Sequence, residues 1–244
     1  MSSLIRQANE LEGDRVKTTW LDYLLSTAAV SLLLVLSVGC VVIASPTLHA
    51  WCGDYHVLVE LALGMLLYGV FAALLARCML RIKPIAPGAY GEDSTVFTYW
   101  KLITVVQRLG QGAMRPFTPV FLLPVVDALY GARIGKDVAF GGEINDPYMV
   151  SVGDGTTLGT QTIISGSFTG QGTLTCGFVR IGRNVTVGPN TTILPDTEIG
   201  DGASVLIGSC LMPGARIPAG EVWRGNPARK WVQTRVPSAS VATD

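Results

Sequence analysis

The chain has 244 residues, with 18 basic and 18 acidic residues and a formal net charge of zero. Its basic residues are scattered, which excludes a typical nucleic-acid-binding surface, so no nucleic acid partner is expected. Only 15% of the residues are charged, and the positive mean hydropathy of +0.42 indicates membrane segments. The five cysteines have no paired spacing and no metal-ligand neighbours, so reduced thiols and no metal are expected.

Two long apolar stretches lie near the N-terminus. Tyr23–Ala44 carries no charge and is long enough to cross a hydrocarbon core of about 30 Å. Val57–Ala76 is interrupted only by Glu60, and the intervening loop Ser45–His56 has no Lys or Arg. These stretches predict a transmembrane helical hairpin over residues 23–81. Their combined length disfavours a buried soluble hairpin, and the polar residues before the first stretch disfavour a signal peptide.

The flanks of this hairpin are basic. Arg6, Arg15 and Lys17 precede it, and Arg77, Arg81 and Lys83 follow its second stretch. By the positive-inside rule, the N-terminal segment 1–22 and the C-terminal part of the chain lie in the cytoplasm. The expected membrane partner is therefore the lipid bilayer, with the chain as an integral membrane protein.

Residues 82–130 are predicted to form a linker and a membrane-interfacial helical segment. A Pro/Gly-rich exit, residues 82–91, is followed by Thr95–Leu109, which has the apolar periodicity of a helix. Met114–Tyr130 is apolar but is broken by three prolines, Pro116, Pro119 and Pro124, which disfavour a third continuous span. We expect this part to lie against the bilayer.

An aliphatic residue recurs every six positions in the C-terminal half, at Ile181, Val187, Ile193, Ile199, Val205, Leu211 and Ile217. Three positions after each of them stands a residue that tolerates a left-handed backbone, namely Asn184, Asn190, Asp196, Gly202, Gly208, Gly214 or Gly220. This period is typical of a β-helix made of short strands and sharp corners. The predicted fold is an all-β parallel β-helix over residues 131–232, with a flexible tail over 233–244.

The repeats begin at Ile134 and Phe140, break around residues 145–148 and resume at Val152. Ile164 and Ile181 are seventeen residues apart, which breaks the six-residue register. Ser165–Arg180 is therefore predicted to be a loop that leaves the β-helix. Loops that project from rigid scaffolds often carry function.

Several stretches resemble a known group. They are KPIAPGAYGEDSTVFTYWKL, LYGARIGKDV, DPYMVSVGDG, IGRNVTVGPNTTILPDTEIGDGA and MPGARIPAGEVWRGNPARKW. The chain resembles membrane-anchored hexapeptide-repeat acyltransferases, and more narrowly the C-terminal units of polylysine-synthetase-type proteins, which are similar to non-ribosomal peptide synthetases. The resemblance implies a left-handed parallel β-helix that transfers an acyl or aminoacyl group to a lipid-linked or polymeric acceptor. It also implies an acyl-CoA or carrier-bound thioester donor, and a bacterial inner membrane location.

The same resemblance implies a homotrimer, or a pseudo-trimer with related subunits, whose active site lies in the groove between neighbouring β-helices. It further places Gly225, Asn226, Arg229 and Lys230 near the coenzyme A nucleotide, where backbone amides and cations suit a pyrophosphate. The alternative is that this turn only caps the last coil with polar groups. The zinc enzymes that share this β-helix need several imidazoles, which this groove does not offer.

Relatives of this type begin the extruded loop with Gly-His-Thr-Phe, whereas this chain has Gly-Ser-Phe-Thr, with Ser167 at the position of the histidine. Histidine suits a general base because its pKa lies near neutrality, and a serine hydroxyl does not. Both histidines, His49 and His56, fall in the predicted outer loop of the hairpin. Asp146 is a candidate substitute base, whereas Cys176 is expected to be a passive thiol.

Two hypotheses remain open. The chain is either a membrane-bound acyltransferase with an unusual base, or an inactive trimeric scaffold or accessory subunit of a membrane complex.

Overall fold

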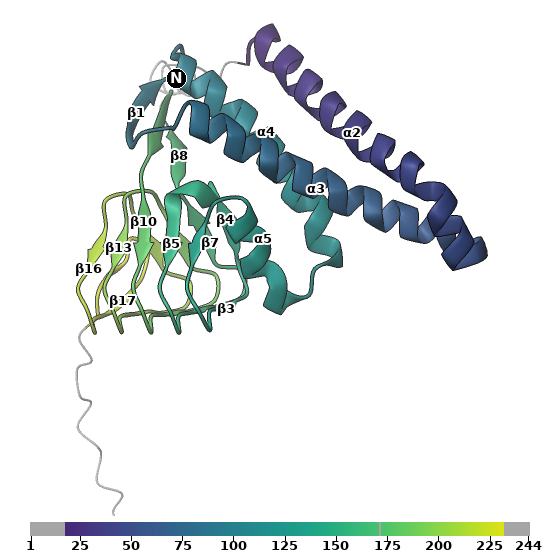
Figure 1. Cartoon of the computed structure of the whole chain (residues 1–244). Helices are drawn as coiled ribbons and strands as arrows, with labels where there is room; N and C mark the ends of the chain where they lie inside the picture. Colours follow the sequence, from purple (N-terminus) through teal and green to yellow (C-terminus); the bar gives the residue numbers. More distant parts are fainter. Residues whose placement is uncertain (1–17, 171, 232–244) are drawn as a thin grey trace, which may run out of the picture.

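The computed structural model describes residues 18–170 and 172–231. Helices occupy the N-terminal half of this part, and a β-helix occupies the C-terminal half (Figure 1). Most of the predicted N-terminal segment 1–22 and the whole predicted tail 233–244 lie outside the described residues.

The N-terminal helices form a hairpin. α2 (Trp20–Cys52) and α3 (His56–Ile82) run in opposite directions and are joined by a short turn, η1 (Gly53–Tyr55) (Figure 1). The Thr19 side chain and the Asp22 carboxylate cap the first turn of α2 reciprocally. By length and composition, the stretch from Trp20 to Ile82 is a candidate for crossing a membrane.

The prediction of a loop over Ser45–His56 was wrong. α2 continues through Pro46 as far as Cys52, so only the three residues of η1 separate the helices. A proline removes a single backbone donor from a helix, and the surrounding apolar helix tolerates that loss here. The hairpin is therefore longer on both arms than the two apolar stretches indicated.

α4 (Thr95–Met114) begins at the predicted residue and extends beyond the predicted end at Leu109. The hydroxyl of Ser94 caps it by accepting a hydrogen bond from the Phe97 amide. α4 packs against α3, and Lys101 on α4 forms an ion pair with Asp22 on α2, with 2.9 Å between Nζ and Oδ2. Both side chains are largely buried, so this pair fixes α4 against the start of the hairpin.

The proline-rich stretch after α4 forms η2 (Arg115–Phe117), η3 (Val120–Leu122) and α5 (Leu123–Leu129). This confirms that no continuous helix spans Met114–Tyr130. Leu123 packs against the core of the β-helix, and α5 contacts its first strand. On the other side of this stretch, large apolar side chains are exposed, at Phe117, Val120, Phe121 and Val125.

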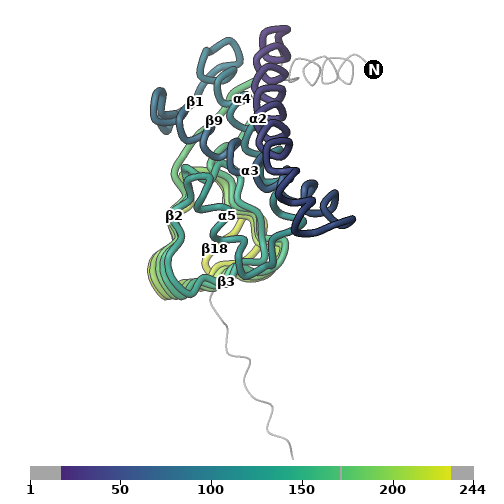
Figure 2. Tube along the Cα trace, turned by 45° about the vertical axis from the view of Figure 1, so that its right-hand side comes forward, coloured from purple at the N-terminus to yellow at the C-terminus, as the bar shows by residue number. Residues whose placement is uncertain are grey.

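The C-terminal domain is a parallel β-helix, whose coils stack almost on top of one another in Figure 2. The first coil contains β2 (Arg133–Ile134), β3 (Ala139–Phe140) and β4 (Glu143–Asn145), and the second contains β5 (Val150–Val152), β6 (Thr157–Leu158) and β7 (Ile163–Ser165). The third contains β10 (Val179–Ile181), β11 (Thr186–Val187) and β12 (Thr192–Ile193), and the fourth contains β13 (Glu198–Ile199), β14 (Ser204–Val205) and β15 (Cys210–Leu211). β16 (Arg216–Ile217), β17 (Val222–Arg224) and β18 (Arg229–Lys230) close it. Equivalent strands of successive coils pair in three sheets, which are parallel except for the final β17–β18 pair.

The predicted six-residue spacing of inward aliphatic residues and the predicted corners are both confirmed. The seven aliphatic residues from Ile181 to Ile217 are all at most 4% exposed and belong to one continuous core. The corner residues have positive φ angles, for example 52° at Asn184 and 66° at Gly208. Each coil buries its apolar side chains against the next coil, so stacking supplies the core that one coil lacks.

The predicted extruded loop is also present, and it is a β-hairpin. β8 (Ser167–Gly170) and β9 (Thr173–Cys176) pair antiparallel, and β9 also pairs with β1 (Gly88–Gly91) from the linker. The loop therefore rises from the β-helix towards the helices (Figure 1).

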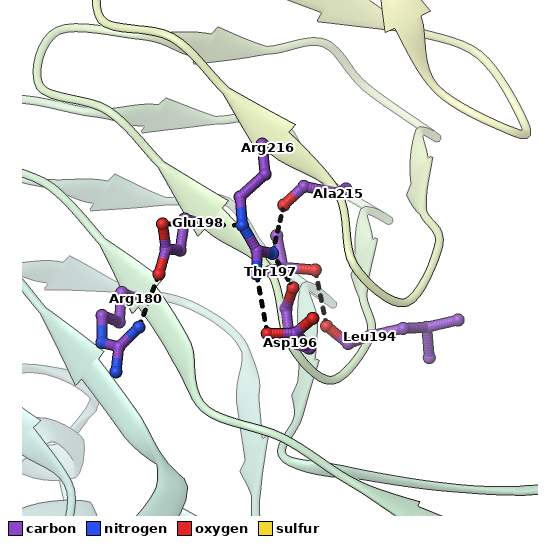
Figure 3. Close-up of polar contacts among 7 residues, drawn as sticks. All are labelled: Arg180, Leu194, Asp196, Thr197, Glu198, Ala215 and Arg216. Carbon is purple, nitrogen blue, oxygen red and sulfur yellow. Dashed lines mark hydrogen bonds and ion pairs between the residues drawn. The ribbon is translucent and has the colours of Figure 1, made fainter. Parts of the chain in front are cut away.

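The outer face of the third and fourth coils and of β16 carries a ladder of charged side chains (Figure 3). Glu198 pairs with Arg180 at 2.5 Å and with Arg216 at 3.6 Å, and Arg216 also pairs with Asp196 at 2.8 Å. All four side chains are exposed, so each pair is worth about 0–1 kcal/mol. The core rather than this ladder holds the coils together.

Candidate functional site

Ser167 and Asp146 lie in contact where the extruded hairpin leaves the β-helix. β4 and β7 pair in parallel with Asn145 opposite Ser165, so the residues that follow these strands meet at one edge. The chain turns sharply at Asp146, where φ is 56°. Ser167 then donates a hydrogen bond from Oγ to Oδ2 of Asp146 over 2.5 Å, and both residues are more than 90% buried.

The second carboxylate oxygen of Asp146 faces α4. Trp100 on α4 donates a hydrogen bond from Nε1 to Oδ1 of Asp146 at 3.2 Å. Both oxygens of the carboxylate therefore have donors, one from the hairpin and one from the helix. These two contacts fix the direction in which the carboxyl group points.

Burial is the largest influence on the protonation of this site. It raises the pKa of Asp146, while the hydrogen bonds from Ser167 and Trp100 and the charge of Arg108 act in the opposite direction. Burial, followed by the nearby Asp146 charge, raises the pKa of the Tyr148 hydroxyl. This hydroxyl is buried and makes no hydrogen bond of acceptable geometry. Burial also raises the pKa of the Cys176 thiol to about 12, as expected for a passive thiol.

The Ser167–Asp146 pair opens onto a pocket of about 390 Å³ between α4 and the extruded hairpin. Apart from Trp100, its lining residues all have polar or charged side chains, namely Thr104, Gln107, Arg108, Gln111, Asn145, Asp146, Ser165, Ser167 and Thr169. The pocket is thus formed within one chain, whereas the resemblance implied a groove between neighbouring subunits.

The half of this pocket that α4 contributes was not predicted from the sequence. The apolar periodicity of Thr95–Leu109 predicted a helix but gave no role to Trp100, Thr104, Gln107, Arg108 or Gln111. These five positions recur at helical spacing, so they share one side of the helix. A polar stripe within an otherwise apolar helix was the available signal.

The residues expected to meet a coenzyme lie elsewhere. Gly225 and Asn226 form the turn between β17 and β18, at the C-terminal end of the β-helix, and they do not line the pocket. Arg229 is exposed, and Lys230 is held by Glu221 at 2.5 Å between Nζ and Oε1. Within one chain, the structure therefore does not bring this turn and the Ser167–Asp146 pair together.

The two histidines are also remote from the pocket. They lie at the hairpin turn, where the Nδ1 atoms of His49 and His56 are 3.2 Å apart, and this turn is far from the β-helix (Figure 1). Among residues 18–170 and 172–231, no cluster of three or more His, Cys, Asp or Glu side chains could hold a metal. The described part of the chain therefore offers Asp146 as the buried ionisable group of the pocket.

The fold and its six-residue period define a hexapeptide-repeat β-helix. In agreement, residues 178–210 match the family described as bacterial transferase hexapeptide (six repeats). No curated protein matches the chain.

Several solved structures are similar in fold. A hexapeptide-repeat-containing acetyltransferase from Vibrio cholerae is 20% identical over 42% of this chain and 62% of its own length, with a TM-score of 0.38. A galactoside acetyltransferase in complex with coenzyme A is 17% identical over 67% of this chain and 82% of its own, with a TM-score of 0.40. A serine acetyltransferase from Brucella abortus is 16% identical over 68% of this chain and 56% of its own length, with a TM-score of 0.36. The chain spans 62% of the length of the Vibrio protein.

Proposed function

We propose that the chain is a membrane-bound acyltransferase that moves an acyl or aminoacyl group from a thioester donor to a hydroxyl or amine acceptor. The observation that carries this proposal is the hydrogen bond from Ser167 to the buried carboxylate of Asp146 at the wall of a polar pocket. Through this contact, the Asp146 carboxylate becomes a proton acceptor for position 167, where the resembling family has histidine. The acceptor would be lipid-linked or polymeric, with its reactive end in the pocket.

The proposed step uses the pair as a proton relay. The acceptor hydroxyl or amine attacks the thioester carbonyl carbon, and its proton passes to Ser167 Oγ while the Ser167 proton passes to Asp146 Oδ2. The carbon–sulfur bond then breaks, and the thiolate leaves. The thiolate takes up the proton that Asp146 holds, which restores the carboxylate. General-base help of this kind contributes about 10²–10⁴-fold to a rate. Trp100 keeps the carboxylate directed at Ser167 throughout.

The donor is proposed to be acyl-CoA or a carrier-bound thioester. The Gly225–Asn226 turn and the exposed Arg229 suit a pyrophosphate, whereas Lys230 is already paired with Glu221. Because this turn lies at the opposite end of the β-helix from the pocket, a neighbouring subunit would have to bring it to Ser167. A homotrimer, or a pseudo-trimer with related subunits, is therefore part of the proposal.

Membrane attachment is proposed through α2 and α3. Large aliphatic side chains are exposed along both helices, for example Ile43 at 80% and Leu61 at 62%. Trp20 and Tyr23 lie at one end of the hairpin, and Trp51 and Tyr55 lie at the other, where amphipathic rings prefer the interface. The exposed apolar side chains of η2, η3 and α5 would rest on the cytoplasmic surface of a bacterial inner membrane.

The test is thiol release from a set of acyl-CoA donors by the full chain in mild detergent, with hydroxyl- and amine-bearing acceptors. The expected result is acceptor-dependent release that Asp146→Asn abolishes. Release that is equal in wild type and Asp146→Asn would contradict the relay. A folded trimer without any release would favour the alternative, an inactive trimeric scaffold or accessory subunit of a membrane complex.

A further inference from the structure

The α4 wall of the pocket carries an arginine, Arg108, whose charge acts on Asp146 without forming an ion pair with it. Arg108 is exposed and lines the pocket, and it donates a long hydrogen bond of 3.5 Å from Nη2 to Oδ1 of Asn145. Within the described residues, it forms no ion pair. A guanidinium group presents several donors in a planar fork, which suits two oxygens of one carboxylate or phosphate.

Two neighbouring polar side chains on the same face each have a buried atom without a hydrogen-bond partner. Gln107 is 2% exposed, and its Nε2 has no hydrogen-bond acceptor. The hydroxyl of Thr104 is buried without a partner as well. Unpaired buried polar atoms are rare in folded proteins, and a missing ligand or water is a common explanation. Both residues line the pocket, where ligand oxygens would satisfy them.

The anion cannot bind directly beside Asp146. There the Asp146 carboxylate would repel it, and both of its oxygens already accept hydrogen bonds from Ser167 and Trp100. The pocket therefore combines donors on α4, at Arg108 and Gln107, with a proton acceptor at Asp146. A molecule that matches it has an anionic oxygen group at one end and a nucleophilic hydroxyl or amine at the other.

We propose that the pocket binds an acceptor with a phosphate or carboxylate group, which is held by Arg108 and Gln107 while its hydroxyl or amine faces Ser167. The acceptor role rests on the proposed acyl transfer, but the binding of the anion does not. The same chemistry is present in a free phosphorylated polyol and in an anionic lipid headgroup at the membrane surface.

The experiment measures binding by the full chain in mild detergent, using inorganic phosphate, glycerol 3-phosphate and glycerol as probes. The proposal expects the two phosphates to bind, glycerol not to bind, and the affinity to fall as salt is added. Arg108→Gln should weaken glycerol 3-phosphate binding by about 10-fold or more. Arg183→Gln is the matched control, because Arg183 lies on the outer surface in an exposed ion pair with Asp201. Equal binding by Arg108→Gln and wild type, or equal binding of glycerol and its phosphate, would overturn the proposal.

A second arm separates the two sources of the anion. The chain is placed in lipid nanodiscs with or without phosphatidic acid, and glycerol 3-phosphate binding is measured again. If phosphatidic acid competes with glycerol 3-phosphate, and Arg108→Gln abolishes this competition, the site binds a lipid headgroup. If phosphatidic acid leaves glycerol 3-phosphate binding unchanged, the site binds a free ligand. Asp146→Asn should keep phosphate binding while it removes transfer. Binding without transfer would therefore reject the proposed function alone, and transfer without Arg108-dependent binding would reject the anion site alone.

Discussion

The Tyr130 hydroxyl donates a hydrogen bond to the carbonyl oxygen of Gly69 at 2.8 Å, and this contact joins the start of the β-helix domain to the middle of the helical hairpin. Tyr130 is completely buried, and burial raises the pKa of its hydroxyl well above the usual value. Gly110 on α4 lies against both Tyr130 and Ala72 of α3. The position of α4, and with it one wall of the pocket, depends on this close packing.

Gly110→Ala should therefore displace α4. Its Cβ would meet the Tyr130 hydroxyl and, at 2.5 Å, the Cβ of Ala72, both of which are buried. Overpacking of this kind costs about 1–3 kcal/mol. We expect a lower thermal midpoint and weaker ligand binding in the pocket, measured on the purified chain in detergent. Gly112→Ala is the control on the same helix, because nothing lies within 4 Å of its Cβ position. Equal midpoints for the two variants would show that α4 is not seated through Gly110.

Removal of either member of the Ser167–Asp146 pair should slow acyl transfer by about 10²–10⁴-fold, since the relay loses its donor or its acceptor. The rate is measured as thiol release by Ser167→Ala and Asp146→Asn. Ser204→Ala, on a distant coil, should leave the rate unchanged. The double variant should be no slower than the worse single variant, because the two groups act as one unit. Fully additive losses would argue for independent roles.

Ser167→His should transfer the acyl group faster than wild type. An imidazole at this position would have a pKa close to neutrality and would lie beside the Asp146 carboxylate, which would orient its ring. The measurement is the same thiol release, accompanied by a thermal midpoint that confirms folding. A folded variant that is slower than wild type would indicate that position 167 does not face the acceptor.

The rate of transfer should rise with pH through the folded-state pKa of Asp146. Burial raises this pKa above its ordinary value, and only the ionised carboxylate accepts a proton. A pH profile of thiol release for wild type should therefore show an acidic limb, which Asp146→Asn should lack. A flat profile in wild type, with release still dependent on Asp146, would mean that the carboxylate is not the base.

The stability of the chain should fall as the pH rises from about 4 to 6, because of Asp127. This carboxyl is fully buried beside Arg115 and Gln111, and burial raises its pKa to about 6. Between the ordinary and the raised pKa, the folded state binds more protons than the unfolded state, so a rising pH favours unfolding. The shift from 3.8 to about 6 corresponds to roughly 3 kcal/mol. Thermal midpoints in detergent should show this slope, and Asp127→Asn should flatten it. An identical slope in that variant would assign the effect to other groups.

The coils of the β-helix could be predicted from the sequence because their determinants are local and repeat. Ile193 and its equivalents point inwards at every sixth position, and Asn190 has the left-handed backbone that a corner requires. The seventeen-residue gap before Ile181 was likewise enough to predict an extruded loop, but not that this loop forms a β-hairpin. Stacking of identical units converts such a local pattern directly into a core.

The helical part was less predictable in detail. Pro46 lies inside α2, so the apolar pattern indicated the hairpin but not the length of its turn. The candidate pair Ser167 and Asp146 was reached by resemblance and by elimination, and nothing in their spacing showed that they touch. Their contact depends on the pairing of β4 with β7.

The six-residue coil, its corners and the residues of its core could be read from the chain alone, because each of these follows from side-chain type and backbone freedom within a few positions. The closure of the site by α4, in contrast, depends on long-range packing. Trp100 and Asp146 are 46 residues apart, and they meet because Gly69 and Gly110 let α3, α4 and Tyr130 approach closely. Such contacts depend on how whole elements pack in three dimensions, which a hydrophobic pattern along one helix does not specify.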